Sequence, residues 1–184
     1  MASNMRVLIT GSEGVLGRYL KQYLERRGYD VRGLDIHGEP EYNASILNVE
    51  ALQAIYREFR PEAVLHLAAL TSPVESWYRE NEYYEINVLG TANIARILDG
   101  DKLVIFTSSC AVYGDAYRVL GRPVREDDIG IDIPLSPYGM SKLMAEQVLE
   151  MYRRQYNVQT VILRLGNIYS PYDNKYVFWK MWTK

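Results

Sequence analysis

The sequence predicts an α/β fold with a doubly wound parallel sheet, and three observations lead to this prediction. Short apolar runs alternate along the chain with longer segments whose apolar residues recur at helical spacing. The apolar runs are continuous, as in strands that helices bury on both faces. The chain has 184 residues, of which 48% are hydrophobic and 24% charged, and this composition suits one well-buried domain.

Each expected element follows from a local pattern. Gly28 and Pro61 are stop signals for the first two helices, and Pro137 is a start signal for the last one. A polar segment with two glycines and two prolines is expected to form a long surface loop at 117–134. Strands are expected at 7–9, 31–35, 63–67, 103–106 and 160–165. Helices are expected at 15–24, 49–59, 74–98 and 137–156.

The bulk properties exclude several classes of function. A net charge of -2 gives no reason to expect a nucleic acid or an anionic membrane as partner. The single cysteine, Cys110, excludes an intrachain disulfide and a cysteine-rich zinc site, and no metal is expected. No apolar run approaches the roughly 20 residues of a membrane span, and residues 1–4 lack the hydrophobic core of a signal peptide. We therefore expect a cytoplasmic protein.

A glycine-rich turn follows the first expected strand and opens the first helix. Gly11, Gly14 and Gly17 have the spacing G-x-x-G-x-x-G. Glycines let the backbone turn sharply and approach a pyrophosphate, while the helix N-terminus offers free N–H groups and a partial positive charge. Because the motif lies between a strand and a helix at the start of a βαβ pattern, it predicts a Rossmann-type dinucleotide site.

The second expected strand ends at Asp35. A carboxylate at this place can accept both hydroxyls of an adenosine ribose. Ile36 and His37 follow it rather than an arginine, so the sequence favours NAD over NADP. The alternative is that Asp35 is only a turn residue before Gly38.

Tyr138 and Lys142 are four residues apart, directly after Pro137. This spacing places the phenol and the ammonium one above the other on the first turns of a helix. A nearby positive charge lowers the pKa of a tyrosine from its ordinary value of about 10, so the tyrosine can exchange a proton with an alcohol. The alternative is a solvated helix face, because this spacing also occurs by chance.

With these three features in place, the chain resembles the extended short-chain dehydrogenases/reductases. It is most similar to the nucleotide-sugar epimerase/dehydratase group, of the UDP-galactose 4-epimerase type. The resemblance runs from Met5 to about Pro171. Its further motifs are His66-Leu67-Ala68-Ala69, Asn87-Val88-Leu89-Gly90-Thr91, Thr107-Ser108-Ser109-Cys110-Ala111-Val112-Tyr113-Gly114 and Arg164-Leu165-Gly166-Asn167-Ile168-Tyr169.

The resemblance implies a role for each matching residue. Ser109, Tyr138 and Lys142 would be catalytic: Ser109 would hydrogen-bond the reacting sugar hydroxyl, Tyr138 would be the acid/base, and Lys142 would hold the nicotinamide ribose. Asn167 would contact the substrate diphosphate, and Asn87 would support the active site. The implied cofactor-binding set is Gly11, Gly14, Val15, Leu16, Gly17, Asp35, Ile36, Leu67, Ala68, Ala69, Tyr138 and Lys142.

Simpler explanations stay open for several of these residues. Ser109 could be a hydroxyl that caps a strand end, and Ser108 could be mistaken for it. The two alanines of the His66-Leu67-Ala68-Ala69 motif could be ordinary packing. Asn87 could be a buried polar group bonded to backbone, and Asn167 could have a plain loop role. His66 is expected to be a hydrogen-bonded core histidine rather than a catalyst.

The sequence departs from the family pattern at three places. Ser45 and Asn48 stand where an aspartate near the adenine is frequent, and Ser170 stands where a glycine is frequent. The 4,6-dehydratases carry an Asp-Glu pair beside the catalytic residue, whereas Cys110 follows Ser109 here, so dehydration is disfavoured. Family members are also longer.

These observations together give one expected organisation and function. Residues 5–171 are expected to form an NAD-binding domain with the catalytic residues, and the apolar tail 172–184 to be a packed helix or the stump of a substrate domain. The expected activity is NAD-dependent epimerisation or oxidation of a UDP- or dTDP-sugar by hydride transfer. The alternatives are a non-catalytic NAD-binding module or assembly partner, and a reductase of another small carbonyl compound. The resemblance also implies a homodimer through the helices at 83–98 and 137–156.

Overall fold

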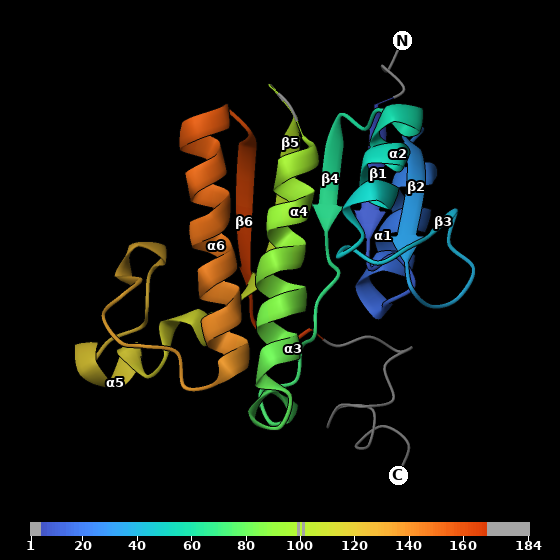
Figure 1. Cartoon of the computed structure of the whole chain (residues 1–184). Helices are drawn as coiled ribbons and strands as arrows, with labels where there is room; N and C mark the ends of the chain where they lie inside the picture. The colour runs from blue at the N-terminus through green and yellow to red at the C-terminus, as the bar shows by residue number, and fades with distance from the viewer. Residues whose placement is uncertain (1–4, 99, 101, 169–184) are drawn as a thin grey trace.

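The computed structural model describes residues 5–98, 100 and 102–168, and these form a parallel sheet covered by helices (Figure 1). The six-stranded sheet has the order β3-β2-β1-β4-β5-β6. All its pairings are parallel, which confirms the predicted doubly wound fold. The strands are β1 (Arg6–Thr10), β2 (Asp30–Asp35), β3 (Tyr42–Asn43), β4 (Ala63–His66), β5 (Leu103–Ser109) and β6 (Gln159–Leu165).

The helices connect these strands and lie over them. The α-helices are α1 (Val15–Glu25), α2 (Val49–Phe59), α3 (Glu80–Tyr84), α4 (Gly90–Ile97), α5 (Ala116–Leu120) and α6 (Pro137–Tyr156). Shorter helical turns are η1 (Glu75–Trp77), the π-helical η2 (Glu85–Leu89), η3 (Cys110–Tyr113) and η4 (Glu126–Asp128). In Figure 1 α4 and α6 lie side by side in front of the sheet.

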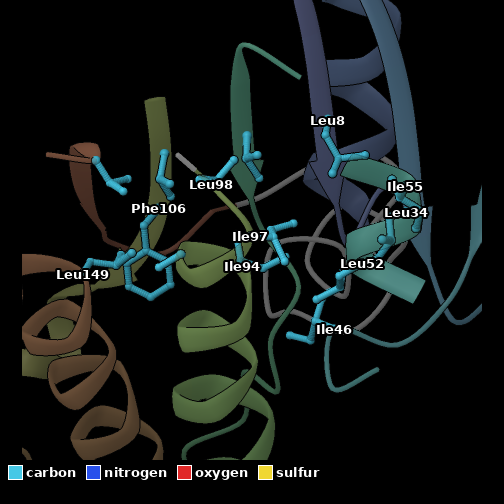
Figure 2. Close-up of a cluster of buried hydrophobic side chains, with 14 of the residues drawn as sticks. Leu8, Leu34, Ile46, Leu52, Ile55, Ile94, Ile97, Leu98, Phe106 and Leu149 are labelled. Atoms are coloured by element: carbon cyan, nitrogen blue, oxygen red, sulfur yellow. The ribbon is translucent and has the colours of Figure 1, made fainter. Parts of the chain in front are cut away.

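The larger part of the core lies between the sheet and α2, α4 and α6. Leu8, Val64 and Val104 point to this face from three neighbouring strands and are fully buried. Leu52 of α2 and Ile94 of α4 pack against them (Figure 2). Burial of this many aliphatic side chains supplies the main driving force for the fold, at about 25 cal/mol for each Å² of apolar surface.

The opposite face of the sheet is covered by α1. Val7, Ile9 and Val31 alternate with the residues of the first face, as the pleat requires, and pack under Leu20 and Leu24 of α1. These runs are therefore buried on both sides. This explains why they read in the sequence as continuous rather than alternating apolar stretches.

The expected helix at 74–98 is wrong at its start. Residues Glu75–Trp77 form the separate turn η1, and the helical segment begins only at Glu80. Arg79 leaves helical geometry, with φ -132° and ψ 36°, and its guanidinium binds Glu75 and Glu82 on either side. The apolar side chains near the expected start are consequently exposed rather than buried.

Two other parts of the chain are more ordered than the sequence indicates. The two-residue strand β3 pairs with the end of β2 and has too few residues to give a pattern. The expected loop at 117–134 contains part of α5 and all of η4. Arg122 makes a bidentate ion pair with Asp128 there, and Asp128 also accepts the backbone N–H of Arg125. The predicted tail 172–184 lies outside the described residues.

Parallel pairing brings the carboxyl ends of the strands to one edge of the sheet. Thr10 pairs with Leu34 and His66, and His66 pairs with Phe106. Asp35 and Ser109 end the strands β2 and β5. Ligands of doubly wound folds bind at this edge, so it is where a site should be sought.

No helix in the described part of the chain is long and apolar enough to cross a membrane.

Candidate functional site

The glycine-rich turn is packed so tightly that two of its glycines leave no room for a side chain. A Cβ on Gly11 would lie 2.7 Å from the backbone nitrogen of Ala68, and Gly11 has φ +70°. A Cβ on Gly17 would lie 2.3 Å from the carbonyl oxygen of Gly11. The turn therefore lies directly against the segment that follows β4, and the first turn of α1 packs onto it, as the motif predicts.

The N-terminus of α1 has features that suit an anion. Its N-cap residue is Gly14, which makes no side-chain cap hydrogen bond, and the first turn contains no acidic residue. The first N–H groups of a helix lack partners within the helix and carry the positive end of its dipole. Together with the close turn at Gly11, this end of α1, where Val15 and Leu16 begin the helix, fits a dinucleotide pyrophosphate.

Asp35 lies beside this turn at the end of β2. One carboxylate oxygen accepts the backbone N–H of Glu13 at 2.9 Å, and the other accepts those of Ile36 at 2.7 Å and His37 at 3.1 Å. These bonds fix the carboxylate next to the glycine-rich turn. These three bonds use most of its roughly four acceptor sites, and the oxygen bonded only to Glu13 keeps a lone pair that can accept a ribose hydroxyl. Ile36 itself is exposed at the surface.

The segment after β4 runs across the turn on its other side. Leu67 donates its N–H to the carbonyl of Thr10, and Ala68 donates to the Thr10 hydroxyl at 3.2 Å. Leu67, Ala68 and Ala69 are all half-buried. The backbone of Ala68 lies close to Gly11, and this approach depends on the absence of a side chain at Gly11.

The two serines at the end of β5 point in different directions. The hydroxyl of Ser108 donates to Glu146 of α6 on the α4/α6 side of the sheet, so it is committed to the core. Ser109 is the N-cap of η3, and its hydroxyl accepts the N–H of Ala111 at 3.2 Å. As an acceptor, the Ser109 hydroxyl still has a proton to donate. Ser109 is thus the serine at the edge of the sheet.

Tyr138 is brought to this edge by the start of α6. Pro137 is the first helical residue, and the Ser136 hydroxyl caps the helix by accepting the N–H of Gly139 at 3.1 Å. A Cβ on Gly139 would lie 2.8 Å from the carbonyl of Ala111, so only a glycine lets α6 approach η3 this closely. The ring of Tyr138 packs edge-on against Tyr83, with ring centres 6.3 Å apart.

Lys142 lies one turn further along α6 and is almost completely buried. Its Nζ is 4.3 Å from the centre of the Phe106 ring, a cation–π contact. Burial lowers the pKa of Lys142 to about 7, and the negative charge of Glu146 opposes this shift. The Lys142 side chain therefore changes between the ammonium and the neutral amine near neutral pH.

Asn87 lies in the π-helical turn η2 and connects three segments. Its side chain exchanges two 2.9 Å hydrogen bonds with the backbone of Leu70 and donates a third to the Ser141 hydroxyl. Ser141 in turn donates to the carbonyl of Tyr138 at 2.8 Å. Asn87 is thus bonded to backbone, as its simpler explanation has it, and also to the first turn of α6.

Sequence reasoning missed the buried ion pair between Glu146 and Arg164. The Arg164 guanidinium reaches Glu146 at 2.8 Å from β6, and it also donates to the Tyr113 hydroxyl at 2.8 Å and to the carbonyl of Glu126. It therefore joins α6, β6, η3 and η4 in one network. The signal in the sequence is an arginine that follows the apolar run at 161–163.

An open pocket of about 410 Å³ adjoins the start of α6. Its lining includes Trp77 and Tyr78 of the η1 region as well as Ala111 and Ser136. Sequence reasoning missed these aromatic residues because it assigned them to a long helix. The pocket is lined by Pro73, Val74, Trp77, Tyr78, Ala111, Gly114, Leu135 and Ser136.

Three further residues that the sequence analysis singled out make only local contacts or lie at the surface. Asn167 is exposed two residues after β6. Ser45 accepts the N–H of Leu47, and Asn48 caps α2 by accepting the N–H of Ala51 at 3.0 Å, so both serve the local backbone. Among the residues that the structure describes, no group of three His, Cys, Asp or Glu side chains could hold a metal ion.

Comparison with known proteins connects this arrangement to one family. The NAD dependent epimerase/dehydratase family matches residues 7–180. A putative UDP-glucose 4-epimerase of Methanocaldococcus jannaschii is 36% identical over 180 residues, which cover 89% of this chain and 56% of that protein. The UDP-glucose 4-epimerase of Halalkalibacterium halodurans is 31% identical over 174 residues, which cover 89% of this chain and 51% of that protein.

Solved structures give the same result. The UDP-glucose 4-epimerase of Thermus thermophilus in complex with NAD has a TM-score of 0.83 at 29% identity, covering 94% of this chain and 58% of its own. The UDP-glucose 4-epimerase of Thermotoga maritima with UDP-glucose has a TM-score of 0.81 at 29% identity. The match covers 94% of this chain and 60% of that protein. The chain spans about half the length of the curated relatives that it matches. It belongs to the NAD-dependent epimerase/dehydratase family.

Proposed function

We propose that this chain is the NAD-binding and catalytic part of a nucleotide-sugar epimerase that acts by hydride transfer at a sugar hydroxyl. One observation carries the proposal. Ser109 ends β5, Tyr138 and Lys142 lie on the first turns of α6, and Gly11 and Asp35 lie at the carboxyl ends of β1 and β2, the edge where a dinucleotide would bind. NAD binding by family members, such as the Thermus thermophilus enzyme, supports the cofactor.

The cradle residues would hold the cofactor in one orientation. The N-terminus of α1 would meet the pyrophosphate, Asp35 the adenosine ribose and Lys142 the nicotinamide ribose. Ile36, Leu67, Ala68 and Ala69 would line the path between them. Bound NAD supplies the hydride acceptor and donor, which no side chain can provide.

The chain's own residues would handle the proton. Tyr138 as phenolate would accept the proton of the sugar hydroxyl, while the Ser109 hydroxyl would hold the same oxygen by a hydrogen bond. The Lys142 ammonium would stabilise the phenolate, because a positive charge within a few ångströms favours the ionised form. Returning the proton from Tyr138 would complete the cycle, so the enzyme is restored without net change.

The pocket beside the start of α6 supports a sugar-sized substrate at this place. A volume of about 410 Å³ lies within the range of ligand sites. Ser136 and Ala111 of its lining are close in sequence to Tyr138 and Ser109. A UDP-sugar is supported by the UDP-glucose in the Thermotoga maritima relative, and a dTDP-sugar is the alternative. Asn167 would contact the substrate diphosphate, and Asn87 would support the site. We assign these roles to a domain of residues 5–171.

Absorbance of the reduced nicotinamide and chromatography of the sugar nucleotides together test the activity, because an epimerase returns its hydride and regenerates NAD. The protein is incubated with NAD and a panel of UDP- and dTDP-sugars, and reduction or interconversion is expected with at least one of them. Tyr138→Phe should lower the rate by about 10²–10⁴-fold with NAD affinity nearly unchanged. Tyr156→Phe, at the exposed far end of α6, is the matched control and should retain full activity.

The results of this assay separate the three functions. Clear NAD binding with neither reduction by any sugar nor interconversion of any sugar would reject the epimerase and favour a non-catalytic NAD-binding module. Oxidation of reduced NAD by a small carbonyl compound, but not by nucleotide sugars, would favour a reductase. Full activity of the Tyr138→Phe protein would refute the role assigned to Tyr138.

A further inference from the structure

His66 is a buried titratable residue that the proposed mechanism does not use. It ends β4, is 1% exposed, and both of its ring nitrogens contact threonine hydroxyls. Nδ1 lies 2.7 Å from Thr10 Oγ1, and Nε2 lies 3.0 Å from Thr91 Oγ1. Burial and the charge of Lys142 lower the pKa of His66 to about 3, so the ring is neutral.

The hydrogen bonds around His66 have a single consistent direction. Thr91 donates its hydroxyl proton to the carbonyl of Asn87 at 2.6 Å, so it accepts from His66 Nε2–H. Nδ1 then has no proton and accepts from the Thr10 hydroxyl. Thr10 in turn accepts the N–H of Ala68. The result is a continuous chain from Ala68 to Asn87 in which every donor has one acceptor.

The two ends of this chain lie at the two halves of the site. Ala68 contacts the glycine-rich turn at Gly11. Asn87 donates to Ser141 of α6, next to Lys142. The His66 ring also stacks on Phe106 with 5.5 Å between ring centres, and the Phe106 ring is the one that Lys142 contacts.

We propose that His66 is a positioning residue that couples the cofactor cradle at Ala68 to the placement of Lys142 on α6. The inference rests on the proposed function, in which both regions contact the same NAD molecule. An ordered Ala68 segment fixes Thr10 and the orientation of the imidazole, and the imidazole fixes Thr91, η2 and Phe106. Coupling of this kind is reciprocal, so occupation of the cradle favours the arrangement of α6 that meets the nicotinamide ribose.

Thr91→Val interrupts the chain with little change of volume. Thr91 is completely buried in α4 and lies outside the proposed cofactor-binding set. NAD affinity, measured by calorimetry, should fall about fivefold or more. Thr91→Ser retains the hydroxyl and should restore the affinity. Ile94→Val, also fully buried in α4, is the control for packing loss and should leave the affinity unchanged.

A double-mutant cycle with Lys142→Met distinguishes coupling from a local effect on the cradle. If His66 acts through the placement of Lys142, Thr91→Val should weaken NAD binding by less than about twofold in the Lys142→Met background. The other groups around position 142, above all Glu146, are unchanged in both backgrounds. Thr10→Val breaks the chain at its cradle end and should also weaken NAD binding in the wild-type background, so the test does not depend on one variant folding.

Unchanged NAD affinity in both threonine-to-valine proteins would overturn the inference while leaving the proposed function intact. An equal loss in the wild-type and Lys142→Met backgrounds would also overturn it, because the effect would then be confined to the cradle. Absence of NAD binding by the wild-type protein would overturn the proposed function and the inference together.

Discussion

At the scale of single residues, Lys142 shows how burial sets a chemical property. An ammonium in a low-dielectric interior favours losing its proton, and here the pKa falls to about 7 from the usual 10.5. Glu146 limits the shift, and the Phe106 ring offers a partial substitute for water. Burial of the charged lysine lowers the free energy of unfolding at a pH below about 7.

We expect Lys142→Met to remove a pH dependence of stability. Between pH 7 and 10.5 the unfolded chain keeps the lysine proton while the folded chain has lost it, so the unfolded state binds more protons and stability rises with pH. The slope is at most about 1.4 kcal/mol per pH unit. Urea unfolding across this range measures it. The Met protein should be the more stable at pH 6, and equal pH dependence in both proteins would refute the assignment.

Gly11 offers a second test at this scale. Gly11→Ala would place a Cβ against Ala68 at a residue with φ +70°, so we expect a large loss of stability and loss of NAD binding. Gly28→Ala is the matched control, because Gly28 has φ +84° but nothing within 4 Å of the added Cβ. The control should lose only about 1–2 kcal/mol and bind NAD normally. Similar behaviour of the two variants would show that contact with Ala68 is unimportant.

At the scale of elements, α6 is held in place on either side of Lys142. Gly139 sets its distance from η3, and Glu146 anchors it to Arg164 of β6 and to Ser108 of β5. The ion pair is buried at Glu146, where removal of one partner leaves an uncompensated charge. These contacts fix the position of the helix that carries Tyr138 and Lys142.

Glu146→Gln should destabilise the protein by about 3 kcal/mol, because Arg164 keeps its charge without a carboxylate partner. It should also lower the pKa of Lys142 further, since Glu146 is the group that raises it. Glu150→Gln, one turn later on α6, removes a surface carboxylate paired with Arg153 and Arg154 and should change little. Chemical denaturation of the three proteins measures the difference. Equal stabilities would show that the Arg164 network does not hold α6.

The elements differ in how far sequence alone determines them. The glycine-rich turn and the start of α6 follow from local rules, because glycine spacing and a Ser-Pro start act within a few residues. The start of the helical segment at Glu80 does not, because the apolar residues Val74, Trp77 and Tyr78 continue the helical pattern before it although they are exposed in the structure. The Glu146–Arg164 pair and the His66 hydrogen bonds join residues far apart in sequence. No local pattern encodes such partners.

At the scale of the whole molecule, the α4/α6 side of the sheet carries apolar residues that the described chain leaves open. Met144 and Met151 of α6 are 42% and 48% exposed, and Leu89 of η2 is 51% exposed. Residues seven apart lie on one face of a helix, so the two methionines form a stripe. We propose that this side pairs with a second copy, as the family resemblance implies.

Light scattering after gel filtration tests the pairing. The wild-type protein should have twice the chain mass of 21.3 kDa, and the double variant Met144→Glu, Met151→Glu should have the chain mass. Tyr19→Glu, which charges an exposed position on α1, is the control and should stay dimeric. A monomeric wild-type protein would reject the pairing without affecting the proposed NAD site.

The central claim is that the glycine-rich turn, Asp35 and Lys142 form one NAD site at a single edge of the sheet. Calorimetric titration of NAD, after removal of any bound nucleotide, tests it directly with the wild-type, Asp35→Ala and Lys142→Met proteins. We predict binding by the wild type and a loss of about tenfold or more, or about 1.4 kcal/mol, in each variant. No binding by the wild type, or full affinity in either variant, would contradict the claim.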